Sequence, residues 1–402
     1  MNFFPSHNDE TENAPEGINA ISSLLIVLPP SNGGPVGPET ELLGLPLARR
    51  MVLGAEQAGF EQIIKLPDDP VPDIAAQRIV VLSGDILPDA KWLRELLHMP
   101  LEPGKMIFEA ETAAMIETTS GQRLFSLKPP FGHGTDDTFA TLSEMFDTSS
   151  CRLGEHRCLS LTPETTVSKA EDWLLGSLVK RTDGFMARLV SRPLSLTLTK
   201  RLAATPVSAN TMTVISTLVG LLGAPFFLSS QPGLQVTGAL LFLTHSILDG
   251  CDGELARLRM KESRFGGMLD YWGDNLVHVA VFTCMAVGWS LEAGSAWPLW
   301  AGVAAATGTL ASAGFVFWRT MRHKGSSGPL FTSVAQAPAG NFSKVADALT
   351  RRDFVYLVVL LSAFGKAAWF LALTAVGAPL FFLFLLVIAY QEAAIGEQVP
   401  NE

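Results

Sequence analysis

The pattern of apolar and polar residues divides the chain into two halves of different character. Between residues 20 and 90, short apolar runs such as SSLLIVL and RIVVLSGD alternate with stretches of helical periodicity. Alternation of strand, helix and strand predicts a doubly wound parallel sheet. We therefore expect an α/β, Rossmann-like domain over residues 20–165, with ligands beyond the carboxyl ends of its strands.

The apolar segments of the second half predict a membrane domain. A helix needs about 20 apolar residues to cross a hydrocarbon core of about 30 Å, and six segments are near that length. They cover residues 207–228, 235–256, 267–290, 297–318, 354–374 and 376–391. The last is the shortest and follows a turn near Gly377. The pattern predicts an all-α, six-helix transmembrane domain over residues 206–392.

Three further segments complete the predicted organisation. Residues 1–19 and 393–402 are predicted to be tails, the first of them disordered. In residues 170–205, apolar side chains interleave with basic ones, namely Phe185, Leu189, Leu194 and Leu198 with Lys180, Arg181, Arg188, Arg192, Lys200 and Arg201. This pattern favours helices lying on an anionic leaflet, and a solvated linker helix is the alternative.

The distribution of charged residues predicts how the protein is oriented in a membrane. Residues 1–175 hold 12 basic and 26 acidic residues, whereas residues 176–402 hold 17 and 13, and the basic ones cluster before span one, between spans two and three, and between spans four and five. Cytoplasmic loops are enriched in Lys and Arg. We expect a multi-pass protein of a bacterial-type inner membrane, with both termini and the second-to-third connection cytosolic, and no nucleic-acid partner.

Acidic residues interrupt the apolar half in the run DGCDGELARLRMKESRFGGMLDYWGD, residues 249–274. On helices, Asp249 and Asp252 share one face at spacing i, i+3, and Asp270 and Asp274 share another at i, i+4. Acids near a membrane pair, bind cations or line a water-filled cavity. Hard oxygen ligands suit Mg²⁺ or Mn²⁺, so the four acids predict a two-metal site.

This run resembles the signature of the CDP-alcohol phosphotransferase superfamily, D-x2-D-G-x2-A-R, eight residues, then G-x3-D-x3-D, and every fixed position matches. The resemblance implies that the four aspartates hold the metals and that Asp270 and Asp274 are catalytic, with Asp274 as the base. It also implies that the CDP group is bound by Gly253, Ala256, Arg257 and Gly266. Asn210, in TPVSANTMT, either donates to the diphosphate or, like Ser208, caps the first span.

The N-terminal half resembles the nucleotidyltransferase domain of sugar-phosphate and inositol-phosphate cytidylyltransferases. Its loop PPSNGGPVGPETE keeps Gly33, Gly34 and Gly37, yet no Arg or Lys follows before Arg49. A triphosphate needs cations and free backbone N–H groups. We expect a degenerate domain, in which Asp85 stands at a metal-binding position or acts as a turn residue.

Together with KRTDGFMARLVSRPLS and RRDFVY, this organisation resembles the bifunctional inositol-phosphate cytidylyltransferase and di-myo-inositol-phosphate-phosphate synthase architecture. That resemblance implies an inositol phosphate as acceptor. Five basic residues are candidates to bind its phosphate, or serve topology alone: Arg319, Arg322, Lys324, Arg351 and Arg352.

The predicted function is metal-dependent transfer of a substituted phosphate from a CDP-alcohol to an acceptor alcohol, with release of CMP. Two alternatives stay open: a phospholipid synthase that uses CDP-diacylglycerol, and an ion or metal transporter, since intramembrane acids also mark ion pathways. We expect His245 and His278 to pack with local hydrogen bonds rather than to act in catalysis. The sequence leaves a homodimer open.

Overall fold

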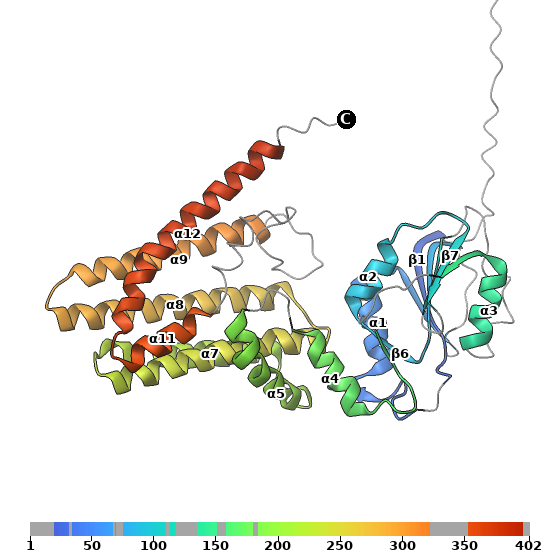
Figure 1. Cartoon of the computed structure of the whole chain (residues 1–402), viewed down its shortest axis with the longest axis horizontal. Coiled ribbons are helices and arrows are strands. Elements are labelled where there is room, and N and C mark those ends of the chain that lie inside the picture. The colour runs from blue at the N-terminus through green and yellow to red at the C-terminus, as the bar shows by residue number, and fades with distance from the viewer. Residues whose placement is uncertain are drawn as a thin grey trace, which may run out of the picture. The chain divides into compact units, whose positions relative to one another are not determined.

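The computed structural model describes residues 20–31, 34–66, 69, 75–109, 113–117, 135–150, 158–179, 184–321 and 353–396. The predicted tail 1–19, the last residues of the predicted tail 393–402, and Gly33 lie outside these ranges. The chain forms two compact units, Met1–Trp173 and Leu174–Glu402 (Figure 1).

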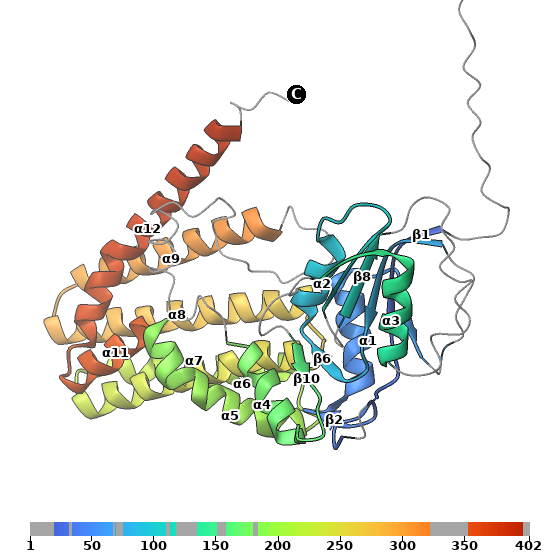
Figure 2. The same ribbon diagram turned by 45° about the vertical axis from the view of Figure 1, so that its right-hand side comes forward.

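The first unit is built on a six-stranded sheet with the order β4-β1-β5-β8-β7-β9 (Figure 2). Its strands are β1 Ala20–Val27, β4 Gln62–Lys65, β5 Ala75–Leu82, β7 Lys105–Glu109, β8 Ala113–Glu117 and β9 Asp147–Ser150. Its helices are α1 Leu47–Ala58, α2 Ala90–His98 and α3 Thr135–Met145, and the boundary with the second unit falls within α4 Val167–Ser177. Two short antiparallel pairs join β2 Glu41–Leu42 to β3 Leu45–Pro46 and β6 Ile86–Pro88 to β10 Cys158–Ser160.

The sheet is mixed, and the prediction of a wholly parallel sheet is wrong. Strands β4, β1 and β5 are parallel, as expected, but β8 runs antiparallel to both β5 and β7. Glu109 of β7 pairs with Ala113 of β8, so a short connection joins the two strands. A connection this short can join only antiparallel strands, because a parallel crossover needs a dozen residues or more.

The sheet is apolar on both faces. Successive residues Ile79, Val80, Val81 and Leu82 of β5 are all fully buried, which explains why this strand reads as a continuous apolar run. Arg50 of α1 is also buried, and its Nη2 donates a 2.7 Å hydrogen bond to the carbonyl of Leu42. Burial lowers the pKa of Arg50 to about 10.

The second unit is helical. A π-helical turn η3 Ala187–Ser191 leads into α5 Arg192–Ala203, and then come α6 Ala209–Gly223 with its 3₁₀ extension η4 Ala224–Leu228, α7 Pro232–Leu258, α8 Arg264–Ala293, α9 Trp297–Met321, α11 Phe354–Ala363 and α12 Ala367–Gly396. Five of the described helices are long and apolar enough to cross a membrane: α6 with η4, α7, α8, α9 and α12. The first four predicted spans coincide with the first four of these helices.

The last two predicted spans differ from the structure, so the count of six is not confirmed. Helix α11 has 10 residues and is about 15 Å long, half of the core thickness. The chain turns at Gly365, which has a φ of 66°, and α12 then continues through Gly377, where a turn was expected. Pro379 lies inside α12 against α9, because a Cβ at Gly308 would be only 2.6 Å from the proline nitrogen.

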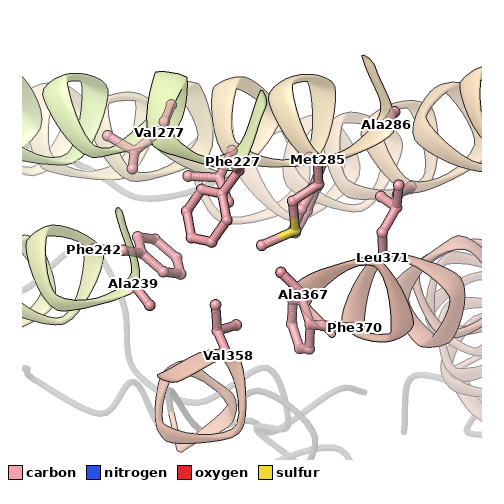
Figure 3. Packing of buried hydrophobic residues seen from close by; sticks show 14 of the residues in the cluster. Phe227, Ala239, Phe242, Val277, Met285, Ala286, Val358, Ala367, Phe370 and Leu371 are labelled. Atoms are coloured by element: carbon pink, nitrogen blue, oxygen red, sulfur yellow. The ribbon is translucent and has the colours of Figure 1, made fainter. Parts of the chain in front are cut away.

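A cluster of apolar side chains joins η4, α7, α8, α11 and α12. Figure 3 shows Phe242 of α7, Met285 of α8 and Phe370 of α12 facing one another in this cluster. Large apolar side chains also point outward, and Leu222, Trp300 and Leu373 are each more than 60% exposed. A membrane domain requires apolar side chains both in its interior and on its outer surface, because that surface contacts lipid.

Candidate metal and nucleotide site

Three of the four predicted metal ligands meet at one place in the second unit. Asp249 of α7 and Asp270 and Asp274 of α8 each bring a carboxylate oxygen within 4.8 Å of the others. Asp249 is 4% exposed and the side chain of Asp274 is 14% exposed. Three carboxylates this close repel one another, and a divalent cation would offset that repulsion. The all-oxygen donor set fits Mg²⁺ or Mn²⁺.

The fourth predicted ligand, Asp252, is not part of this group of three. It is buried, and its two oxygens accept hydrogen bonds from the hydroxyl of Thr213 and from the backbone N–H of Gly253. Thr213 lies on α6 and is itself 3% exposed. Thr213 was not among the residues predicted from the sequence. Thr213 lies three residues after Asn210, and this spacing places both polar side chains on one face of an apolar helix.

Two residues of the predicted CDP-binding set are in contact. A Cβ at Gly266 of α8 would lie 2.8 Å from Oδ1 of Asn210 on α6, so a larger residue at position 266 would require this amide to shift. The cap of α6 is Ser208, whose hydroxyl accepts a 3.1 Å hydrogen bond from the N–H of Thr211. Of the two roles considered for Asn210, capping therefore belongs to Ser208.

The remaining CDP-binding candidates lie on the last turns of α7. Arg257 extends over Gly253, where a Cβ would be 3.1 Å from its Nη1. Ala256, on the same turn, is partly buried. Both small residues leave the helix backbone accessible to a flat or anionic group.

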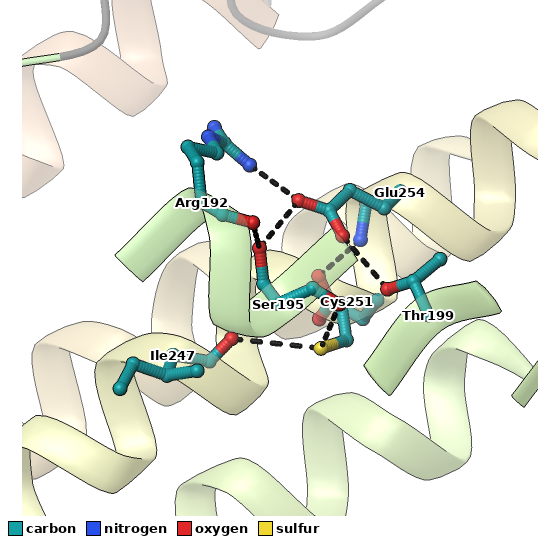
Figure 4. A network of polar contacts seen from close by, with 8 residues as sticks. Arg192, Ser195, Thr199, Ile247, Cys251 and Glu254 are labelled. Carbon is teal, nitrogen blue, oxygen red and sulfur yellow. Dashed lines mark hydrogen bonds and ion pairs between the residues drawn. The ribbon is translucent and has the colours of Figure 1, made fainter. Parts of the chain in front are cut away.

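A buried carboxylate next to this turn was not expected from the sequence. Glu254 of α7 is fully buried, and three side chains of α5 bind it (Figure 4). Arg192 Nη1 and Ser195 Oγ each lie 2.7 Å from Oε1, and Thr199 Oγ1 lies 2.7 Å from Oε2. Ser195 and Thr199 of α5 therefore face α7. Leu194 on the same helix is 51% exposed, as an interfacial helix requires.

The two histidines differ from one another. His245 is 2% exposed, and its Nδ1 lies 2.9 Å from the carbonyl of Ser216 on α6. Its Nε2 lies 3.4 Å from Oδ1 of Asp274, a contact that sequence analysis missed. His278 packs edge-on against Phe242 at 5.6 Å. Both histidines line a small pocket with Asp274.

Of the five predicted acceptor-phosphate residues, the structure describes Arg319. Arg319 lies near the end of α9 and is partly exposed. The other four candidates, Arg322, Lys324, Arg351 and Arg352, lie outside the described residues.

In the first unit, Asp85 ties two loops together. Its Oδ2 accepts a 2.7 Å hydrogen bond from the N–H of Ser31, and its carbonyl accepts one from Leu161. A Cβ at Gly84 would lie 2.6 Å from the nitrogen of Pro30, so the glycine-containing loop after β1 is held tightly at its start. This geometry favours the turn role of Asp85.

The segment that holds the three carboxylates is similar to known proteins. A model of the CDP-alcohol phosphatidyltransferase family matches residues 207–343. Over 126 residues the chain is 36% identical to the "Bifunctional IPC transferase and DIPP synthase" of Thermococcus kodakarensis, and over 90 residues it is 33% identical to the "Archaetidylinositol phosphate synthase" of Pyrococcus horikoshii. These matches cover 31% and 22% of this chain and 28% and 46% of the two relatives, so the chain spans less than half of either.

Among solved structures, Mycobacterium tuberculosis phosphatidylinositol phosphate synthase (PgsA1) with CDP-DAG bound is 18% identical, at a TM-score of 0.33 over 48% of this chain and 92% of that one. Asp249, Asp270 and Asp274, together with Asn210 and Gly266, all fall inside the segment that the family model matches. The part of the second unit that holds these residues is therefore similar to the CDP-alcohol phosphatidyltransferase family.

Proposed function

We propose that this protein transfers a substituted phosphate group from a CDP-alcohol to the hydroxyl of an acceptor alcohol and releases CMP. The observation that carries the proposal is the meeting of Asp249, Asp270 and Asp274 within 4.8 Å, inside the segment that matches the family model. The contact between Asn210 and Gly266 supports it, because it joins two predicted CDP-binding residues from different helices.

In the proposed reaction, the acceptor oxygen forms a bond to the phosphorus that carries the donor alcohol, and the bond from that phosphorus to the CMP oxygen breaks. Asp274 accepts the proton of the acceptor hydroxyl. Asp249, Asp270 and Asp274 would hold divalent metal, with Asp252 as a further ligand. Bound metal would neutralise the diphosphate and the departing CMP. Arg257, over Gly253, would bind the diphosphate.

The acceptor is proposed to be an inositol phosphate, held by basic residues near the ends of spans four and five. This choice over glycerol phosphate is supported by the similarity to the "Bifunctional IPC transferase and DIPP synthase" of Thermococcus kodakarensis. It is also supported by the runs KRTDGFMARLVSRPLS and RRDFVY. A phospholipid synthase that uses CDP-diacylglycerol would share every donor-side residue. We also propose that the membrane domain has six spans, that the protein forms a homodimer, and that the site and both termini lie in the cytosol.

The first unit is proposed to have lost nucleotidyl transfer or to retain it only weakly. The bond from Ser31 to Asp85 supports this, since it engages both the loop that would cradle a triphosphate and the acid that would hold its metal. Efficient formation of CDP-inositol from CTP and inositol phosphate by the full chain would contradict this proposal.

One experiment tests donor and acceptor together. Purified full-length protein is incubated with CDP-inositol or CDP-diacylglycerol and a panel of alcohols, with Mg²⁺, Mn²⁺ or EDTA, and CMP is quantified. We expect CMP only with metal, and fastest with an inositol phosphate. If no donor gives metal-dependent CMP while proteoliposomes show metal flux, the protein is a transporter instead.

A further inference from the structure

Helix α5 is fixed rigidly against α7. Glu254 of α7 accepts three hydrogen bonds from side chains spaced along α5 (Figure 4). At its C-terminal end, Nη2 of Arg259 donates to the carbonyls of Leu202 at 3.0 Å and Thr205 at 2.6 Å, which satisfies groups that a helix end leaves open. Side chains on the inner face of α5 therefore have defined positions relative to α7.

Arg192 and Arg257 lie over the same surface of α7. A Cβ at Gly250 would be 3.5 Å from Cβ and Oγ of Ser195 and 3.7 Å from Nη1 of Arg192, and a Cβ at Gly253 would be 3.1 Å from Nη1 of Arg257. Residues three apart are neighbours on a helix, so the two glycines form one patch with a guanidinium over each end. Larger side chains at either glycine would fill the space between the arginines and α7.

The charges at this patch suit an anion. Arg192 and Arg257 repel one another where solvent is partly excluded. Glu254 pairs directly with Arg192 at 2.7 Å, and the carboxylates of Glu262, Glu254 and Asp252 act on Arg257 through charge attraction. The Nε of Arg257 is buried and has no hydrogen-bond partner among the residues that the structure describes. A buried donor in this state costs free energy unless a ligand pairs with it.

We propose that Arg192 is a second donor-binding residue, which together with Arg257 binds the diphosphate of the CDP-linked donor over the Gly250–Gly253 patch, and that Glu254 positions it. This inference rests on the proposed function. An anionic lipid headgroup offers the same phosphate chemistry, and the experiment below separates the two sources. Because Arg192 begins the interfacial helix, donor binding would link α5 directly to the catalytic domain.

The test measures binding of CDP and of CMP, with Mg²⁺, to the full chain by calorimetry in nanodiscs with and without phosphatidylglycerol. The variants are Arg192→Gln, Glu254→Gln and the double variant, with Arg201→Gln as the matched control, because Arg201 is an exposed arginine on the same helix. We expect Arg192→Gln to weaken CDP binding about 10-fold, to weaken CMP binding less, and to do so equally in both lipids. Arg201→Gln should keep CDP affinity, and Glu254→Gln, which removes the charge that positions Arg192, should weaken CDP binding by less than Arg192→Gln does.

The double variant decides between binding and folding roles. It removes the ion pair without leaving a buried lone charge, so it should restore thermal stability while CDP binding stays weak. Restored CDP binding in the double variant, unchanged binding in Arg192→Gln, or a loss seen only with phosphatidylglycerol would each overturn the inference. If the wild-type protein itself bound no CDP, the proposed function would fail first.

Discussion

The hydroxyl of Tyr356 at the start of α11 lies 2.6 Å from the hydroxyl of Ser191, which stands 165 residues earlier in the chain. Next to this pair, Oδ1 of Asp353 accepts a 3.2 Å hydrogen bond from the N–H of Ala187. The two contacts join η3 to the beginning of α11. The described parts of the runs KRTDGFMARLVSRPLS and RRDFVY, residues 184–195 and 353–356, are thus neighbours in the second unit.

Close approach at this junction requires glycine at position 184. A Cβ there would lie 2.6 Å from Cγ of Asp353, and the carboxylate cannot move without losing its bond to Ala187. We expect Gly184→Ala to lower the free energy of unfolding by about 1 kcal/mol and the melting temperature in detergent accordingly. Gly377→Ala in α12, where a Cβ meets nothing within 4 Å, is the control and should be neutral or stabilising. Equal melting temperatures of the two variants would contradict the proposed close contact at position 184.

Removal of any one of the three clustered carboxylates should abolish metal-dependent chemistry. We expect Asp249→Asn, Asp270→Asn and Asp274→Asn each to reduce CMP release at least about 100-fold, because bound metal contributes several kcal/mol to such reactions. The same variants should lose the rise in melting temperature that Mg²⁺ gives the wild-type protein. Glu262→Gln is the control, since Glu262 is an exposed acid between the two motifs. Two variants with near-wild-type turnover at saturating Mg²⁺ would show that the site is elsewhere.

Much of this arrangement follows from local patterns in the sequence. The spacing of Asp270 and Asp274 fixes their common helix face, and apolar length alone locates α6 to α9. The antiparallel direction of β8 does not follow, because a buried strand reads the same in either direction. The course of α12 through Pro379 depends on its contact with Gly308 of α9, which only the folded chain brings about.

Contacts between distant segments explain the other failures. Glu254 looks like one more acid in a charged run, and its burial depends on Ser195 and Thr199, more than 50 residues earlier. His245 reads as an isolated imidazole in an apolar helix, and nothing in the sequence shows that it reaches Asp274 on another helix.

Thr213 should position Asp252 for metal binding. Its hydroxyl donates to Oδ2 of Asp252, and hydrogen-bond partners of metal ligands commonly affect metal affinity 10-fold or more. We expect Thr213→Val, which keeps the shape but removes the hydroxyl, to raise the Mg²⁺ concentration for half-maximal activity about 10-fold. Thr213→Ser should restore the wild-type value, and Thr217→Val, one turn further along α6, is a second control. A uniform loss of stability in Thr213→Val with unchanged Mg²⁺ dependence would leave Thr213 a packing role only.

The orientation of the membrane domain can be tested at two connections. The connection between η4 and α7 has the sequence SSQPG and no basic residue, whereas the one between α7 and α8 lies among Arg257, Arg259, Lys261 and Arg264. Because basic connections remain in the cytosol, Ser230→Cys should react with an impermeant maleimide added outside spheroplasts, and Glu262→Cys should react only after lysis. Both substitutions are made in a chain without its native cysteines, and both positions are exposed, so differences in labelling report the side of the membrane. The reverse pattern would place the three-carboxylate site on the outer face, away from any cytosolic supply of CDP-linked donor.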